Sequence, residues 1–188
     1  MGNPSDDAAG RIVLAAVACI ERLGIHELTV RDIAKEAGVN VAAVNYYFRS
    51  KDALIERVLR DRLDHFVGEA FGLLDDGGKP VQERAFDLLL YILNGSLDWP
   101  RMMQAMLAAR AGDERFGTEL RGGLRAVVAK LGAVLDSGGA RAPMAKAAKL
   151  VAAVVLPGML PGTFDGLPSI GLSGAGERSD FVRALLEG

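Results

Sequence analysis

Side chains that donate hydrogen bonds to phosphate gather in one short stretch of this 188-residue chain. Tyr46, Tyr47, Arg49 and Lys51 lie close together there, and phenolic hydroxyls and cationic groups are common donors to the phosphate oxygens of nucleic acids. A turn that only connects two helices has no need of them. The stretch therefore predicts contact with a nucleic-acid backbone.

Two short helices are predicted to position these side chains. Thr29 is a suitable N-cap and Asp32 follows at the third helical position, so a capped helix begins here. Gly38 can supply the positive φ that ends this helix. Asn40 can then cap a second helix, residues 41–48, with its side-chain oxygen.

The second helix is expected to have one packing face and one open face. Val44 and Phe48 are four residues apart on one face, whereas Val41, Ala42 and Asn45 lie on another and are small or polar. This arrangement is typical of a helix-turn-helix, whose second helix enters the major groove of DNA. Short capped helix pairs also occur in bundles that contact no DNA, and the bare pattern leaves that alternative open.

Residues 11–60 resemble the N-terminal domain of the TetR/AcrR family of bacterial transcriptional regulators. The family motif has the form T-x-x-x-I-A-x-x-A-G-V, a short variable segment, Y-x-F or Y-Y-F, and then S-K with an apolar residue. The matching residues of this chain are Thr29, Ile33, Ala34, Ala37, Gly38, Val39, Tyr47, Phe48, Ser50, Lys51 and Leu54. Asn45 departs from the tyrosine of many members and is similar to a recurring N-Y-Y-F or N-Y-H-F version. Beyond residue 75 only the pattern of helices is similar.

The resemblance implies roles for particular residues in binding DNA. Thr29, Tyr47 and Lys51 would hold phosphates. Arg31 would reach a base edge, unless it only pairs with a neighbouring carboxylate. The whole expected contact set is Thr29, Arg31, Asn40, Val41, Ala42, Asn45, Tyr46, Tyr47 and Lys51. Because residues 29–51 carry only a small excess of positive charge, we expect a homodimer on an inverted repeat in double-stranded DNA.

The fold class expected is all-α, because helix-forming residues fill the periodic segments and no alternating β-branched run appears. An N-terminal three-helix helix-turn-helix domain, residues 1–50, should precede a helical ligand-binding and dimerisation domain, residues 51–188, whose residues 51–74 form a connector helix. Other helices are predicted at residues 8–23, 81–94, 99–111, 116–135, 143–156 and 179–187. The Gly- and Pro-rich segment 157–178 is expected to be irregular, and its role is left open.

The helix over residues 143–156 is apolar around most of its circumference and needs burial on two sides. One side can be the core of its own domain. The family resemblance implies that the other side, with residues 179–187, forms the dimer interface, and Val151 and Val155 are the candidate residues. The alternative is that the helix is only core.

A small, largely apolar effector is expected to bind within residues 81–175. Methionines suit an adaptable pocket and follow a tryptophan on one predicted helix, although methionines at this spacing are more often plain core. The family resemblance favours a ligand site. The candidate residues are Phe71, Tyr91, Trp99, Met102, Met103, Met106 and Phe116.

Enzyme chemistry and metal binding are not expected. His26 and His65 are far apart in sequence, neither is spaced from Cys19 as a ligand or triad partner would be, and no phosphate-binding glycine motif occurs. No cofactor, signal peptide or membrane-spanning segment is expected, so the predicted location is the cytoplasm. The predicted function is a repressor that an effector releases from its operator. The alternative is a helical protein-interaction module without regulatory DNA binding.

Overall fold

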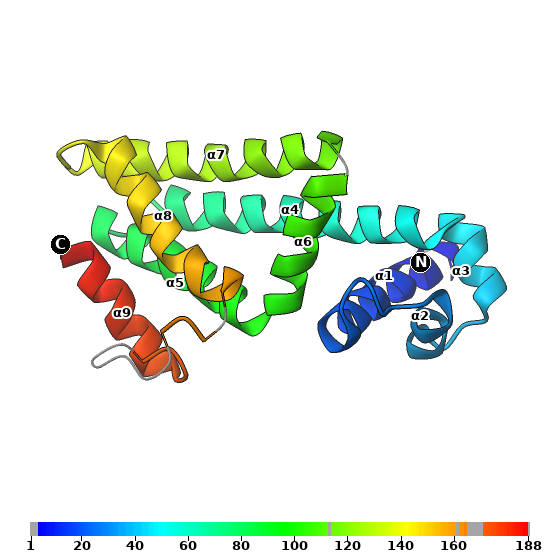
Figure 1. Ribbon diagram of the computed structural model, residues 1–188. Coiled ribbons are helices and arrows are strands. Elements are labelled where there is room, and N and C mark those ends of the chain that lie inside the picture. The colour runs from blue at the N-terminus through cyan, green and yellow to red at the C-terminus, as the bar shows by residue number, and fades with distance from the viewer. Residues whose placement is uncertain (1–3, 113, 161, 165–170, 188) are drawn as a thin grey trace.

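The computed structural model describes residues 4–112, 114–160, 162–164 and 171–187 (Figure 1). Within these ranges the chain is all-α, with a helix-turn-helix at the N-terminus and a larger helical domain after it, as predicted. The helices are α1 Pro4–Leu23, α2 Val30–Ala37, α3 Val41–Phe48, α4 Lys51–Asp75, α5 Val81–Asp98, α6 Pro100–Gly112, α7 Glu114–Ser137, α8 Pro143–Met159 and α9 Ala175–Glu187.

One group of buried side chains, here called the N-terminal cluster, holds α1, α2 and α3 together. It consists of Ile12, Ala15, Ala16, Val17, Cys19, Ile20, Leu28, Ile33, Ala34, Val44, Leu54, Ile55, Val58, Leu59, Leu63, Met102, Ala105, Phe116 and Leu120. The first half of α4 supplies five of these residues, so this helix is part of the N-terminal core as well as the connector. Met102 and Phe116 come from the larger domain, so the core of the N-terminal domain does not end at residue 50.

Polar contacts also join the two domains, where the C-terminus of α1 meets the N-terminus of α6. The Glu21 carboxylate accepts a hydrogen bond from the Met102 backbone N–H at 2.6 Å, and the Arg101 guanidinium donates to the Arg22 carbonyl. An acidic group at a helix N-terminus and a basic group at a helix C-terminus both complement the helix dipoles. Each helix therefore caps the other.

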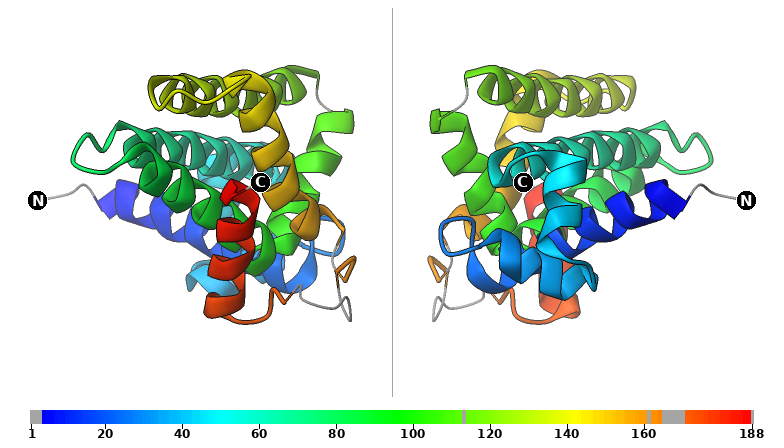
Figure 2. Two further views of the ribbon diagram at one scale, coloured as in Figure 1. Left: turned by 90° about the vertical axis from the view of Figure 1, so that its left-hand side faces the viewer. Right: turned by 90° about the vertical axis from the view of Figure 1, so that its right-hand side faces the viewer.

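A second group, the C-terminal cluster, fills the larger domain. It consists of Ala70, Leu74, Ala85, Leu88, Leu89, Ile92, Leu93, Val127, Leu131, Val134, Leu135, Ala147, Leu150, Val151, Val154 and Val182. In Figure 1 the second half of α4 runs between α7 and α5, and it packs against both. A Cβ atom at Gly123 would lie 3.1 Å from side-chain carbons of Leu63 and Val67, so the absence of a side chain lets α7 approach α4 closely. Helix α9 packs against α5 at the end of the molecule away from α1–α3 (Figure 2).

The predicted break at Asn94–Gly95 is wrong, because α5 continues to Asp98. Burial of Leu93 and Ser96 on either side keeps this segment helical. The helix ends at Trp99, and Pro100 opens α6, where a missing N–H costs nothing.

The predicted end of α8 at residue 156 is also wrong, because the helix passes through Pro157 to Met159. Pro157 and Gly158 are both buried, and a Cβ at Gly158 would overlap the backbone of Ser96 on α5. The Ser96 hydroxyl donates to the Val154 carbonyl at 3.1 Å, one turn before the proline. Tight packing on α5 thus outweighs the usual cost of a proline within a helix.

Helix α9 begins at residue 175 rather than at the predicted residue 179. The Glu177 carboxylate accepts hydrogen bonds from the Ser173 and Gly174 N–H groups, each at 3.0 Å, and so caps the first turn. Of the segment predicted to be irregular, residues 161 and 165–170 lie outside the described residues.

Candidate nucleic-acid interface

The N-terminus of α2 is fixed by a capping box between Thr29 and Asp32, as the sequence predicts. The Asp32 N–H donates to Thr29 Oγ1 at 3.2 Å. The Thr29 hydroxyl and N–H donate in turn to Asp32 Oδ2, at 2.5 and 3.0 Å. These hydrogen bonds, that from the hydroxyl foremost, lower the pKa of the Asp32 carboxyl. Since Asp32 occupies both donors of Thr29, a phosphate contact by Thr29 would have to replace one of them.

The turn between α2 and α3 has the predicted geometry. Gly38 has a φ of 66°, and the Val39 N–H donates to the Ala34 carbonyl at 3.0 Å. Asn40 Oδ1 accepts a hydrogen bond from the Ala43 N–H at 2.8 Å and so caps α3. The side-chain amide NH₂ of Asn40 lies on an exposed residue and is chemically able to donate to a phosphate.

Helix α3 has the two faces predicted for it. Val44 is 1% exposed and belongs to the N-terminal cluster, and Phe48 packs against the same cluster. The opposite face is open to solvent, with Ala42 and Asn45 exposed and Tyr46 exposed over 81% of its surface. The open face is a short ridge of small and polar groups of the kind that fits a major groove.

A tight turn after α3 sets the direction of the residues expected to hold phosphates. Arg49 has φ 63° and ψ −39°, an uncommon conformation for a side-chain-bearing residue, and the Ser50 N–H donates to the Phe48 carbonyl at 2.7 Å. Ser50 Oγ caps α4 by accepting from the Ala53 N–H at 3.1 Å. Lys51 is therefore the first residue of a capped helix whose N-terminus lies beside the end of α3.

Arg31 is exposed at the second position of α2 and forms no ion pair with any described residue. The neighbouring carboxylates have other partners: Asp32 bonds Thr29, and Glu36 pairs with Arg22 at 3.3 Å. The alternative in which Arg31 merely pairs with a neighbouring acid is therefore not seen. Its guanidinium is free for another partner.

The sequence from residue 12 to residue 58, which covers this whole constellation, matches the family model of the bacterial regulatory proteins of the tetR family. The N-terminal domain is therefore a domain of the TetR family. One relative is the HTH-type transcriptional repressor KstR2 of Mycolicibacterium smegmatis, which is 37% identical over 84 residues. Another is the HTH-type transcriptional regulator BetI of Yersinia pestis, 37% identical over 60 residues.

These sequence matches extend over less than half of each protein. The KstR2 match covers 43% of this chain and 40% of the relative, and the BetI match covers 32% and 30%. The chain thus spans less than half the length of the curated relatives that it matches.

Solved structures extend the likeness of fold to nearly the whole chain. A transcriptional regulator from Rhodococcus sp. Rha1 has a TM-score of 0.72 at 23% identity and covers 95% of this chain and 94% of its own. FadR of Bacillus subtilis, solved in complex with stearoyl-CoA, has a TM-score of 0.68 at 15% identity and covers 95% of each chain. The C-terminal half therefore has the TetR fold although its sequence has diverged.

The candidate ligand residues are divided between the two clusters of buried side chains. Met102 and Phe116 lie in the N-terminal cluster, and Met106 packs against it. Phe71 and Tyr91 pack instead against the C-terminal cluster, and Lys130 Nζ lies 5.7 Å from the centre of the Phe71 ring. On α6, Met102 is therefore part of the core that this helix shares with the N-terminal domain.

The two remaining candidates lie at the start of α6. Trp99 is 45% exposed and Met103 is half-buried, so neither is a core residue. The plain-core alternative for the methionines therefore describes Met102 but not Met103.

Tyr91 has a more distinctive setting than the other candidates. Its ring stacks on Phe66 of α4, with 6.1 Å between the ring centres. Burial raises the pKa of the Tyr91 phenol, and the Glu69 carboxylate adds to this effect, whereas the Arg62 guanidinium opposes it. Arg62 is not among the candidate residues predicted from sequence, although its place four residues from both Val58 and Phe66 puts a cation on an apolar stripe.

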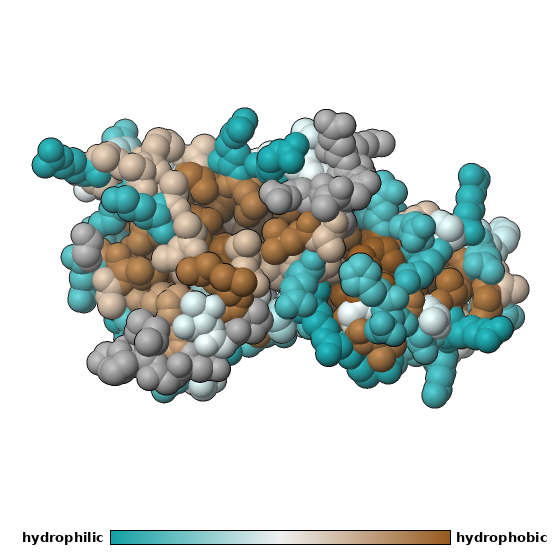
Figure 3. All heavy atoms as spheres, in the orientation of Figure 1, coloured by the Kyte–Doolittle hydropathy of each residue, from teal (hydrophilic) through white to brown (hydrophobic). Residues whose placement is uncertain are grey.

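The outward face of α8 is largely apolar, and it is exposed in the part of the chain that the structure describes. Its exposed residues follow helical spacing and include one cation; they are Met144, Ala145, Ala148, Lys149, Ala152, Leu156 and Met159. Figure 3 shows the hydrophobic surface that runs along this helix. The two residues proposed from sequence lie elsewhere, because Val151 is 7% exposed within the C-terminal cluster and Val155 packs against it.

The described residues contain no group of three or more His, Cys, Asp and Glu side chains placed to hold a metal ion. Among the helices that the structure describes, none is long and apolar enough to span a membrane.

Proposed function

We propose that this protein is a sequence-specific, DNA-binding transcriptional regulator that acts as a repressor. The observation that carries the proposal is the open face of α3, which the turn at Gly38 and the cap at Ser50 hold clear of the N-terminal cluster. In the proposed complex α3 lies in the major groove. Val41, Ala42 and Asn45 face base edges, while Tyr46, Tyr47 and Lys51 face phosphates.

The proposed active form is a homodimer on an inverted repeat. One protomer offers few cations to DNA, so two reading helices are needed for tight and selective binding. The exposed and largely apolar face of α8 supports this assembly, because exposed apolar side chains that gather on one face mark an interaction site. Two-fold symmetry would then place the two copies of α3 in successive major grooves.

A small-molecule effector is proposed to control the affinity for DNA. The core of the N-terminal domain includes side chains of α6 and α7, and α4 passes through both clusters. A ligand that shifts these helices would change the spacing of the two copies of α3. It must favour the non-binding spacing by a few kcal/mol to release DNA effectively.

Selection of fragments from the source genome by gel shift tests the proposed function. We expect retention of particular fragments that contain an inverted repeat, with affinity that falls steeply as salt increases. Asn45→Ala should weaken this retention, whereas Ala129→Ser, on the exposed face of α7, should not. If the folded protein retains no fragment selectively, the chain is a protein-interaction module rather than a DNA-binding regulator.

A further inference from the structure

Arg62 occupies an unusual place at the boundary between the two clusters of buried side chains. It follows Val58 by one turn of α4 and precedes Phe66 by one turn, so its side chain leaves the helix on the stripe that faces the interior. Val58 belongs to the N-terminal cluster, and Phe66 packs against both clusters. Arg62 is half-buried at this boundary between the domains.

The charge of Arg62 has no partner among the residues that the structure describes. Its Nε is inaccessible to solvent and has no hydrogen bond. Other arginines of α4 are paired: Arg57 with Asp61 at 2.7 Å, and Arg60 with Glu56 at 2.8 Å. A buried, unanswered donor costs free energy, so this departure needs a physical reason.

Arg84 shows that the burial of one nitrogen is not sufficient by itself. Its Nε is also buried without a hydrogen bond, but its Nη1 donates to the Leu74 carbonyl at 3.0 Å at the end of α4. Arg84 therefore has a structural role as a helix cap. For Arg62, no described carbonyl or carboxylate provides an equivalent.

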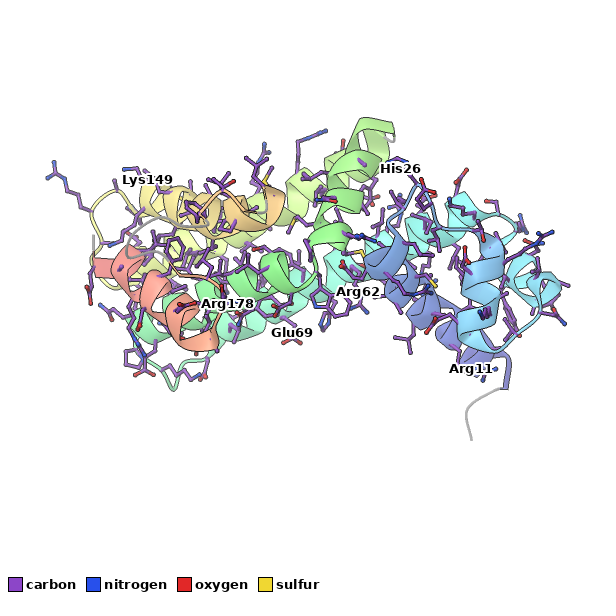
Figure 4. The ribbon with its side chains drawn as sticks, turned by 60° about the horizontal axis from the view of Figure 1, so that its bottom comes forward. Arg11, His26, Arg62, Glu69, Lys149 and Arg178 are labelled. Atoms are coloured by element: carbon purple, nitrogen blue, oxygen red, sulfur yellow. The ribbon has the colours of Figure 1, made fainter. Side chains whose placement is uncertain are left out.

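The surroundings of Arg62 combine aromatic surface with a second polar group. Phe66 lies one turn along α4 from it, and the Phe66 ring stacks on the Tyr91 ring of α5. Glu69, two turns along, is exposed and forms no ion pair with Arg62 in the described structure. Figure 4 shows Arg62 nearer to the N-terminal domain and Glu69 farther along the same helix. Along this part of α4 the positive charge of Arg62 is therefore the one that lies near the boundary between the domains.

We propose that Arg62 binds the carboxylate of the effector, and that the effector is an amphipathic anion whose apolar part lies against Phe66 and Tyr91. A guanidinium presents parallel N–H donors that match a carboxylate, and such charge-assisted pairs are strong in partly buried sites. The proposal rests on the proposed function for the existence of an effector and adds its chemical class. It also explains the unpaired donor: the partner arrives with the ligand.

The test uses the 188-residue protein without DNA. The three probes have carbon chains of equal length and are decanoate, decanol and decylamine, each below its micellar concentration. Affinity is measured by calorimetry. We expect decanoate to bind at least about tenfold more tightly than decanol, since one charged pair is involved. Arg62→Gln should abolish that preference without weakening decanol binding, and Arg62→Lys should restore part of it. Arg57→Gln, on the exposed side of the same helix, should leave the preference unchanged.

A structural role for Arg62 predicts a different result in thermal unfolding. Because its donor is unpaired without ligand, Arg62→Gln should leave the unfolding temperature of the free protein unchanged or raise it. A large decrease would mean that Arg62 stabilises the fold, and it would overturn the proposal. Equal affinities for decanoate and decanol, absence of decanoate binding, or a preference for decylamine, which would implicate Glu69, would also overturn it. If the unaltered protein shows no selective DNA binding, the proposed function is contradicted, but the preference for decanoate over decanol is not.

Discussion

At the scale of single residues, Lys51 is the clearest candidate for a phosphate contact. It is the first residue of α4 and follows the tight turn at Arg49. Lys51→Ala should weaken binding to all DNA sequences alike and reduce the slope of log affinity against log salt by about one unit per removed contact. Fluorescence anisotropy over a salt series measures this slope. Lys79→Ala, exposed between α4 and α5, is the control, and an equal effect of both variants would contradict the assignment.

Arg31 should contribute selectivity rather than general affinity. It has no ion-pair partner among the described residues, and it stands at the start of α2, where the family resemblance implies a base contact. Arg31→Ala should cost about 1–3 kcal/mol on the preferred operator and relax preference at one base pair. Competition binding with single-base operator variants would reveal this change. If Arg31→Ala changes neither the affinity for the operator nor the base preference, Arg31 makes no base contact. Lys51→Ala is the comparison, because it should weaken binding to all sequences equally.

At the scale of elements, the capping box makes the stability of α2 depend on pH. The pKa of Asp32 is lowered in the folded state, so its contribution is present above the ordinary carboxyl value and is lost as pH falls through the lowered one. The unfolding temperature should therefore fall more for the natural protein than for Asp32→Asn between about pH 5 and pH 2. Thermal unfolding by circular dichroism measures the difference. Asp64→Asn, exposed on α4, should not show it.

Local signals explain why α2 and α3 could be predicted to the residue. Thr29, Gly38 and Asn40 act within one turn of the backbone that they cap, so neighbouring sequence is sufficient. The course of α5 through Gly95 and of α8 through Pro157 depends on where these two helices cross. The crossing could not be predicted from neighbouring residues, because Ser96 and Val154, which are hydrogen-bonded there, are 58 residues apart in the sequence.

At the scale of the whole molecule, the exposed face of α8 is the proposed dimer interface. Ala152→Glu should give monomers with a folded core, because it places a charge in an apolar interface of about 2,000 Å² or more. Light scattering measures the mass, and DNA affinity should fall with it. Ala129→Glu, exposed on α7, is the matched control. Intact dimers of both Ala148→Glu and Ala152→Glu would refute this interface.

Val151→Glu separates assembly from folding. Val151 is buried in its own protomer, so a carboxylate there should unfold the C-terminal cluster rather than only divide a dimer. The sequence showed that α8 is apolar nearly all round, but it could not assign each face. The same limit applied to the candidate ligand residues, whose neighbours depend on how α6 crosses the molecule.

The contribution of α6 and α7 to the N-terminal cluster has a consequence for protein engineering. A fragment ending near residue 60 would lose Met102, Ala105, Phe116 and Leu120 from its core, together with the cap that α6 provides for the end of α1. The N-terminal domain is therefore not expected to fold normally when it is transferred to another protein without α6 and α7. A chimera that joins this N-terminal domain to the C-terminal domain of another regulator should keep the α6 side chains that contact α1. Without these side chains, a change in the chimera's response to a ligand would reflect a destabilised N-terminal domain rather than a change in ligand specificity.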